Sequence, residues 1–167
     1  RAIPGVQGAT AMSGLPPNRP LNANDTDIGN YTAPPEGPYE NVDYYQNVMT
    51  GYFETMGIPI VQGRSFQAGD ATATGLVAIV NETLVNTFWK DLNPIGQQLR
   101  PCCDRPWFTV VGVAKDVKQG GVDQKTGTEF YFLIDQTANQ TQFAAAPGTL
   151  NIVLRTTLAA AALRSAI

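Results

Sequence analysis

Arg64 is the residue whose type and position most clearly allow chemistry at a site. It follows Gly63 at the end of the run "GYFETMGIPIVQGR". A guanidinium binds a carboxylate through two parallel hydrogen bonds, and Asp70 is the nearest candidate further along the chain. Arg64 could equally hold a backbone carbonyl or bind an anionic ligand. We predict a structural clamp, because such pairing is a common structural use of arginine and no binding motif surrounds it.

The remaining residues give little support for catalysis. The chain has no histidine, which removes the commonest general base and the commonest transition-metal ligand. No motif pairs the carboxylates, no G-x-S-x-G is present, and the loop "KQGGVDQKTG" lacks the order of a phosphate-binding loop. We therefore predict a non-enzymatic chain with no catalytic, cofactor-binding or metal-binding residues. Six carboxylates could still converge as a catalytic pair: Asp43, Glu54, Asp70, Asp104, Asp116 and Glu129.

The two cysteines, Cys102 and Cys103, are neighbours. Consecutive Cα atoms lie about 3.8 Å apart, closer than an unstrained disulfide requires. Two unbridged thiols, a strained or intermolecular disulfide and a redox pair remain open. A zinc site is not supported, because two thiolates do not supply four ligands.

Length, charge and composition restrict the class of protein. The 167 residues suit one domain, and the net charge of −3 with scattered cations argues against a nucleic-acid partner. Charged residues make up only 15%, whereas 16 glycines and 12 prolines indicate a turn-rich fold that contains strands. No run approaches the roughly 18 apolar residues of a membrane helix.

The first half of the chain predicts strands separated by turns. Residues 1–40 are rich in proline and glycine and predict loop with short extended pieces, including a strand within 5–14. The alternation from Val42 to Val48 predicts a strand with one apolar face, although it places Gln46 on that face. A short helix over 51–56 should end at Gly57 in the left-handed conformation, and Pro59 predicts an edge position for the strand 58–62.

The second half predicts a strand, a helix and further strands. The apolar run 76–80 predicts a strand covered on both faces, followed by a helix that Asn81 caps and that ends before Pro94. Gly96 lies in the turn "NPIGQQL", and Gly112 interrupts the strand "WFTVVGVAKDV", which predicts a bulge or a close backbone contact. Strands over 129–134 and 149–156 and a helix from Leu158 complete the prediction.

Five segments taken in order, "PGVQGATAMSGLP", "VMTGYFETMGIPIVQGRSF", "VAIVNETLVNTFW", "DLNPIGQQL" and "WFTVVGVAKDVKQGG", resemble the MacB-like periplasmic core domain of FtsX-like ABC transporter permeases. The resemblance implies an α+β fold: a mixed sheet with a βαβ, porter-like lobe and a smaller β-rich lobe. Residues 1–66 and 140–167 would form the porter-like lobe, truncated at both ends, and residues 67–139 the second lobe. Arg64 would then lie at the junction of the lobes.

The same resemblance implies a function and a location. The domain would lie on the periplasmic face of the bacterial inner membrane, tethered by membrane helices outside this sequence. It would form a homodimer in the intact permease and couple ATP hydrolysis by a cytoplasmic ATPase to movement that reaches a periplasmic adaptor or a substrate. The Pro-rich N-terminal segment and the cysteine pair depart from the family pattern, so no particular substrate or adaptor is implied. The alternative is a stand-alone periplasmic or secreted module that binds a ligand in an aromatic cleft.

Overall fold

A computed structural model describes residues 3–101, 105–138, 149–159 and 163. One hydrogen-bonded sheet of ten strands runs through the described residues, in the order β10-β1-β4-β9-β6-β8-β7-β2-β3, with β5 paired to β8 off this path. The strands are β1 (Val6–Met12), β2 (Asn24–Ile28), β3 (Asn41–Val42), β4 (Tyr44–Val48), β5 (Ile60–Gly63), β6 (Val77–Asn81), β7 (Gln98–Pro101), β8 (Phe108–Ala114), β9 (Glu129–Leu133) and β10 (Asn151–Thr156). The helices are α1 (Tyr52–Met56), the 3-10 helix η1 (Ala68–Thr72), α2 (Glu82–Phe88) and α3 (Ile134–Ala138).

The sheet mixes parallel and antiparallel pairs. β4 and β9 are parallel, and so are β6 and β8, which α2 connects in a βαβ unit. The other pairs, including β6 with β9 and β1 with β10, are antiparallel. The predicted α+β class with a mixed sheet is confirmed. β2 pairs with β7, and β3 pairs with β2, although both precede β4 in the chain. The hydrogen bonding therefore runs without a break across residues of both predicted lobes. The two-lobe division remains a prediction.

Each face of the sheet buries its own apolar cluster. In β9, Phe130 and Phe132 belong to one cluster, while Tyr131 and Leu133 belong to the other. This is the alternation that a strand covered on both faces requires. α2 contributes Leu84 and Phe88 to the first cluster, and α1 contributes Tyr52 and Phe53 to the second.

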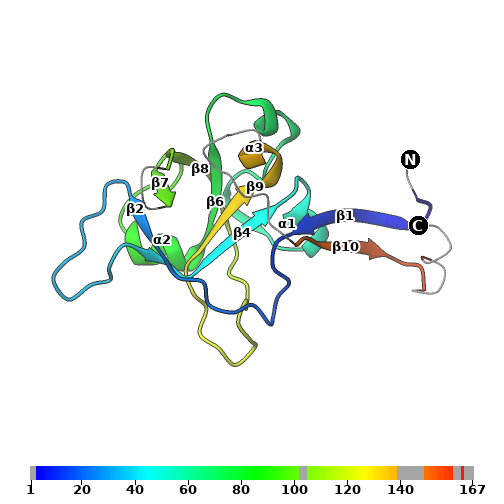
Figure 1. The fold of residues 1–167 in the computed structure, drawn as a ribbon, viewed down its shortest axis with the longest axis horizontal. Helices are drawn as coiled ribbons and strands as arrows, with labels where there is room; N and C mark the ends of the chain where they lie inside the picture. Colours follow the sequence, from blue (N-terminus) through cyan, green and yellow to red (C-terminus); the bar gives the residue numbers. More distant parts are fainter. Residues whose placement is uncertain (1–2, 102–104, 139–148, 160–162, 164–167) are drawn as a thin grey trace.

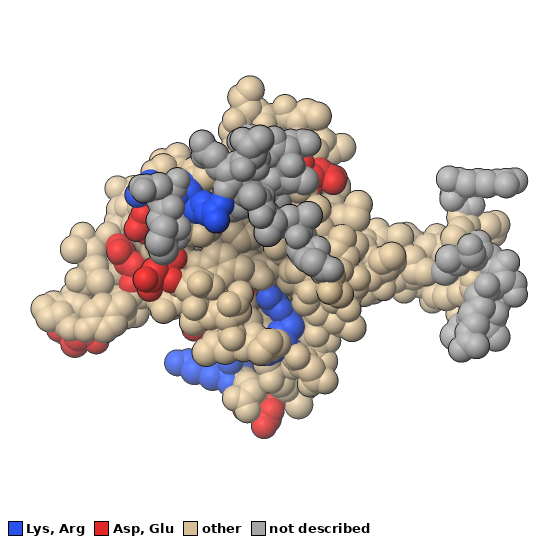
Figure 2. Space-filling model, viewed as in Figure 1, with Lys and Arg blue, Asp and Glu red and all other residues tan. Residues whose placement is uncertain are grey.

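β1 and β10 form a two-stranded arm that projects from the body of the molecule (Figure 1). On the face drawn in Figure 2, charged side chains gather over the body and the described part of the arm shows none. The exposed β10 residue Ile152 lies on this arm and is 76% exposed. The predicted helix from Leu158 falls almost entirely outside the described residues.

Candidate functional site

Arg64 and Asp70 form the predicted clamp. Arg64 Nη1 donates to Asp70 Oδ2 at 2.7 Å, and Arg64 Nη2 donates to Asp70 Oδ1 at 2.8 Å. The Gln67 amide also donates to Asp70 Oδ2 at 2.8 Å, which ties the carboxylate to the start of η1. Burial raises the pKa of Asp70, but the hydrogen bonds from Arg64 and Gln67 outweigh it, and the net shift of this pKa is downward. The contact is therefore an ion pair already satisfied within the protein.

Three of the predicted glycines surround this clamp. Gly63 has φ +72°, a conformation that side chains rarely adopt, and Arg64 donates its amide to Val111 in β8 at 2.9 Å. A Cβ at Gly112 would lie 2.2 Å from the Arg64 carbonyl oxygen, so this position requires glycine. The β6–β8 register shifts at this point, which confirms the predicted bulge and close backbone contact. The Gly96 amide donates a hydrogen bond to the Val110 carbonyl at 2.9 Å, next in the chain to the Val111 carbonyl that accepts from Arg64.

The other predicted residues lie elsewhere. Gly57 ends α1 in the left-handed conformation, with its amide bonded to Glu54, as expected. Pro94 lies after the end of α2 and accepts a hydrogen bond from the Gln97 amide at 3.1 Å. Asn81 caps α2 by accepting from the Leu84 amide at 3.0 Å, which confirms the predicted cap. Asn81 also reaches a second group of polar residues.

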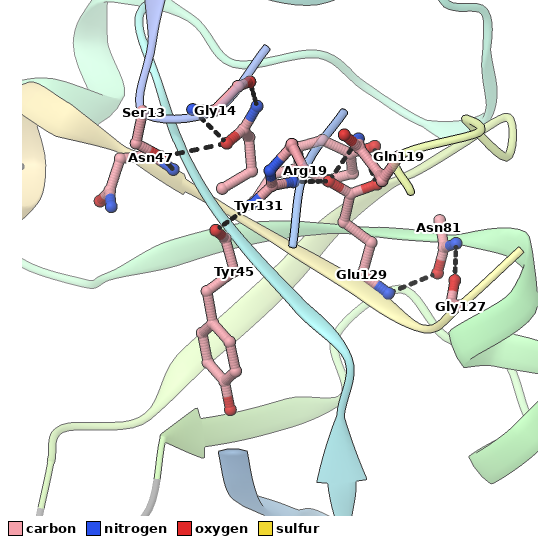
Figure 3. Close-up of polar contacts among 11 residues, drawn as sticks. Ser13, Gly14, Arg19, Tyr45, Asn47, Asn81, Gln119, Gly127, Glu129 and Tyr131 are labelled. Carbon is pink, nitrogen blue, oxygen red and sulfur yellow. Dashed lines mark hydrogen bonds and ion pairs between the residues drawn. The ribbon is translucent and has the colours of Figure 1, made fainter. Parts of the chain in front are cut away.

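This second group, the Glu129 cluster, consists of Arg19, Gln119, Glu129 and Tyr131 (Figure 3). Glu129 is fully buried at the start of β9. Its carboxylate accepts from Arg19 Nη1 at 3.0 Å, from Tyr131 Oη at 2.7 Å, and from Gln119 Nε2 at 2.7 and 2.9 Å. Its amide donates to Asn81 Oδ1 at 2.9 Å. Four donated hydrogen bonds satisfy an ionised carboxylate inside the protein.

Residues 13–22, which we call the strap, carry Arg19 across β4. At one end of the strap, the Ser13 amide donates to Asn47 at 2.9 Å; at the other, the Asn22 amide donates to Asp43 at 3.1 Å. In the middle, the Arg19 backbone amide donates to the main-chain carbonyl oxygen of Gln119 at 2.9 Å. The side-chain Nη2 of Arg19 donates to the Tyr45 carbonyl at 2.7 Å. The strap is therefore bonded to β4 at one end, to Asp43 just before β4 at the other, and to the Glu129 cluster at its centre.

Gln46 explains how a polar side chain fits within the buried face of β4. Its Oε1 accepts from Ser13 Oγ at 3.0 Å and from the Gly14 amide at 3.1 Å, and its Nε2 donates to the Gly14 carbonyl at 2.5 Å. The side chain is fully buried. The alternation of β4 thus places one hydrogen-bonded amide among apolar residues, as a buried polar group requires.

Burial dominates the electrostatics of the Glu129 cluster. It raises the pKa of Glu129 to about 7, against the opposing hydrogen bonds from Tyr131, Gln119 and Arg19 and the positive charge of Arg19. Burial together with the charge of Glu129 raises the pKa values of Tyr131 and Tyr52 well above their usual range. Both tyrosines therefore stay neutral near pH 7, while Glu129 titrates there.

Two pockets flank Arg19, which contributes to the lining of both. One, of about 570 Å³, lies between the strap, the segment 38–44, α2 and the loop 120–128. The other, of about 510 Å³, lies between the strap and residues Tyr45 and Asn47 of β4. Leu21 also lines both pockets. Both pockets are therefore bordered by the centre of the strap, at Arg19 and Leu21.

The described carboxylates named as candidates for catalysis are bound to different partners. Asp43 accepts from Thr128, Asp116 accepts from Thr83, and Asp70 accepts from Arg64. Within the described part of the chain, no group of three His, Cys, Asp or Glu side chains is placed to hold a metal ion. Cys102, Cys103 and Asp104 lie outside the described residues. What the Glu129 cluster can do chemically is bind and release a proton.

Sequence reasoning did not identify the Glu129 cluster as a site. Arg19 lies in a proline-rich segment predicted as loop, and Glu129 entered only as one of six carboxylates. A signal was present nonetheless, because Gln46 and Glu129 stand in strands whose other residues are mainly apolar. A polar residue at a buried strand position requires a partner, and that requirement points to the strap.

The match of the chain to a protein family agrees with the fold described above. The model of the MacB-like periplasmic core domain matches residues 1–167, so the chain belongs to this family, which supplies extracytoplasmic domains of ABC transporter permeases. This confirms the resemblance seen in the sequence. No curated protein sequence matches the chain.

Two solved structures show the same fold. The periplasmic region of MacB from Actinobacillus actinomycetemcomitans matches with a TM-score of 0.59 at 15% identity, covering 98% of this chain and 64% of that one. The extracellular domain of the ABC-type transporter YknZ from Gram-positive bacteria matches with a TM-score of 0.62 at 14% identity, covering 98% of this chain and 71% of that one. The chain thus spans 64% of the length of the MacB region. In the part of the chain that the structure describes, no helix has the length and apolarity to cross a membrane.

Proposed function

We propose that this domain has no catalytic role and couples ATP hydrolysis on the cytoplasmic side of an ABC transporter to movement on the extracytoplasmic side, where an adaptor or a substrate is handled. The observation that carries the proposal is the family match over residues 1–167. The partners we propose are a cytoplasmic ATPase, which acts through membrane helices of the permease, and a second copy of the permease.

The geometry supports a mechanical role. An element that passes on force must move as a unit, and the sheet continues by hydrogen bonding from β10 to β3. The arm of β1 and β10 joins this sheet through the pairing of Met12 with Val48 in β4. The Arg64–Asp70 clamp fixes η1 to the end of β5, beside the pairing of Gly63 in β5 with Gly112 in β8. We propose that the clamp stiffens this junction during the movement.

The experiment uses the full-length permease assembled with its ATPase. Cys102 and Cys103 are replaced by Ser, and a nitroxide is placed at the exposed residue 36 through Glu36→Cys. Electron–electron distance measurements between the two copies should show a change in distance on ATP binding. An unchanged distance in a transporter that binds ATP would contradict coupling, and the absence of any inter-copy distance would contradict the homodimer.

The clamp is tested in the same transporter. Arg64→Ala should leave the affinity for ATP unchanged and reduce the ATP-dependent distance change, because the junction yields instead of passing on the movement. Lys115→Met, which breaks an exposed ion pair, is the matched control and should preserve the full change. An undiminished change in Arg64→Ala would show that the clamp has no part in coupling.

A further inference from the structure

We propose that Glu129 is a proton-controlled latch: ionised Glu129 holds Arg19 and keeps the strap closed over β4, and protonated Glu129 releases Arg19 and lets the centre of the strap open. This goes beyond the coupling role, because it assigns a proton-binding site and a movable segment within the domain. Both states can be derived from the contacts around Glu129.

The closed state is the one that the structure shows. Every hydrogen bond that reaches the Glu129 carboxylate is donated to it, from Arg19, Gln119 and Tyr131. The Arg19 side chain is 8% exposed and that of Glu129 is 1% exposed. A buried ion pair with this number of additional donors is stable only while the carboxylate is charged.

Protonation converts one oxygen of Glu129 into a donor that faces other donors. The proton needs an acceptor, and Gln119 supplies one, because Gln119 Oε1 is buried and has no hydrogen-bond partner among the described residues. Rotation of the Gln119 amide exchanges Nε2 and Oε1, so the same side chain that donates to the carboxylate then accepts from the carboxylic acid. The cluster thus satisfies Glu129 in either protonation state.

Arg19 has no such second arrangement inside the protein. Once Glu129 is neutral, the guanidinium loses its counter-ion and keeps only uncharged partners: the carbonyl oxygen of the acid, the Tyr45 carbonyl, and the face of the Tyr44 ring, 5.3 Å from the ring centroid. A cation without an anion is costly to keep buried. The two pockets that flank Arg19 offer it water on either side, and its departure joins them into one cavity.

The groups that surround Glu129 leave Arg19 as its counter-ion. The loop 115–128 presents Gln119, β6 presents Asn81, and β9 presents Tyr131. α1 adds the neutral phenol of Tyr52, β4 adds the ring of Tyr44, and the nearby Asp43 is already bonded to Thr128. Burial raises the pKa of Glu129 to about 7, so both states are populated close to neutral pH.

The latch is tested on the 167-residue chain by two NMR measurements. The ¹³C shift of the Glu129 carboxyl carbon follows its titration, and amide hydrogen exchange, corrected for the intrinsic effect of pH, follows the strap. The Arg19 amide should lose protection about tenfold for each pH unit below the midpoint, because the ionised fraction falls by that factor. The amides of Ser13 and Asn22, which bond to Asn47 and Asp43, should keep their protection. A midpoint below about pH 5, or an Arg19 amide whose protection does not change through the midpoint, would overturn the proposal.

Variants separate the latch from general destabilisation. Glu129→Gln imitates the protonated acid, so the Arg19 amide should exchange rapidly at every pH, with no step. Asp70→Asn breaks the partly exposed Arg64–Asp70 pair and should retain the step of the wild type. A step that persists in Glu129→Gln would assign the response to another group. If Glu129→Gln does not fold, the carboxyl titration and the hydrogen-exchange profile of the wild type still test whether Glu129 controls the strap.

Discussion

The two carboxylate–arginine pairs of this domain differ in their surroundings more than in their geometry. The Arg64–Asp70 pair leaves the arginine side chain 37% exposed, whereas Arg19 and Glu129 are 8% and 1% exposed. The pKa of Asp70 is lowered, and that of Glu129 is raised to about 7. With water close by, the hydrogen bonds prevail and the ion pair persists until the pH is acidic. Without water, desolvation prevails and the ion pair breaks near neutral pH.

Removing the cation of the buried pair should have the largest effect. Arg19→Met keeps an apolar stem of similar length but leaves Glu129 without its counter-ion. We expect a loss of about 3 kcal/mol in the free energy of unfolding at about pH 8, and about 1 kcal/mol near pH 5.5, where Glu129 is already protonated. Urea denaturation at the two pH values measures this. Equal losses at both would show that Arg19 contributes packing and no charge.

The titration of Glu129 should itself be visible in the stability of the wild type. A carboxyl whose pKa is higher in the folded chain than in the unfolded chain binds its proton more tightly when folded. Its contribution is therefore complete below about pH 4.5 and is lost as the pH rises through about 7. The loss is on the order of 3 kcal/mol.

Comparison with Glu129→Gln isolates this contribution. In this variant the free energy of unfolding should change less between about pH 4.5 and 7, because the titrating group is gone. Thermal unfolding across this range, for both proteins, is the measurement. Parallel pH profiles for the two proteins would contradict a raised pKa at Glu129.

The contribution of the partly exposed Arg64–Asp70 clamp to the free energy of unfolding should depend on pH in the opposite direction to that of Glu129. The pKa of Asp70 is lower in the folded chain, so its contribution is present above the unfolded value of about 3.8 and is lost as the pH falls through the folded one. Asp70→Asn should cost about 1–2 kcal/mol at neutral pH, less than a fully buried pair because Arg64 is partly solvated. The difference from the wild type should shrink as the pH falls below about 3.8. A difference that grows in acid would contradict a lowered pKa at Asp70.

The sequence predicted the clamp because its determinants are local. Arg64 and Asp70 lie close together in the chain, and Gly63 and Gly112 reveal tight backbone positions by their residue type alone. The alternation in β4 and the apolar runs of β6 and β9 likewise encode their elements within a few residues. The pairing of these strands into one sheet is known only from the structure, because neither the local pattern nor the two-lobe prediction implies it.

The Glu129 cluster could not be predicted in the same way. Arg19 and Glu129 are 110 positions apart, and the sequence around Arg19 indicates only a proline-rich loop. β2 was missed for a related reason: "NDTDI" has no apolar alternation, and the strand exists because it pairs with β3 and β7. Contacts of this kind form only because the folded sheet brings distant segments together. The residues near each partner in the sequence therefore do not reveal them.

A third ion pair, more exposed than the other two, extends the comparison and should show the smallest effect. Lys115 Nζ lies 3.0 Å from Glu82 Oε2, with the two side chains 58% and 28% exposed. Lys115→Met keeps the aliphatic stem and removes the charge, and we expect a change of no more than about 0.5 kcal/mol, which added salt should reduce. Urea denaturation at low and high ionic strength, between about pH 5.5 and 8, should show no step with pH. Because this pair has the same short N···O distance as the buried one, a loss above about 1 kcal/mol would mean that distance, and not burial, sets the strength of the ion pairs in this domain.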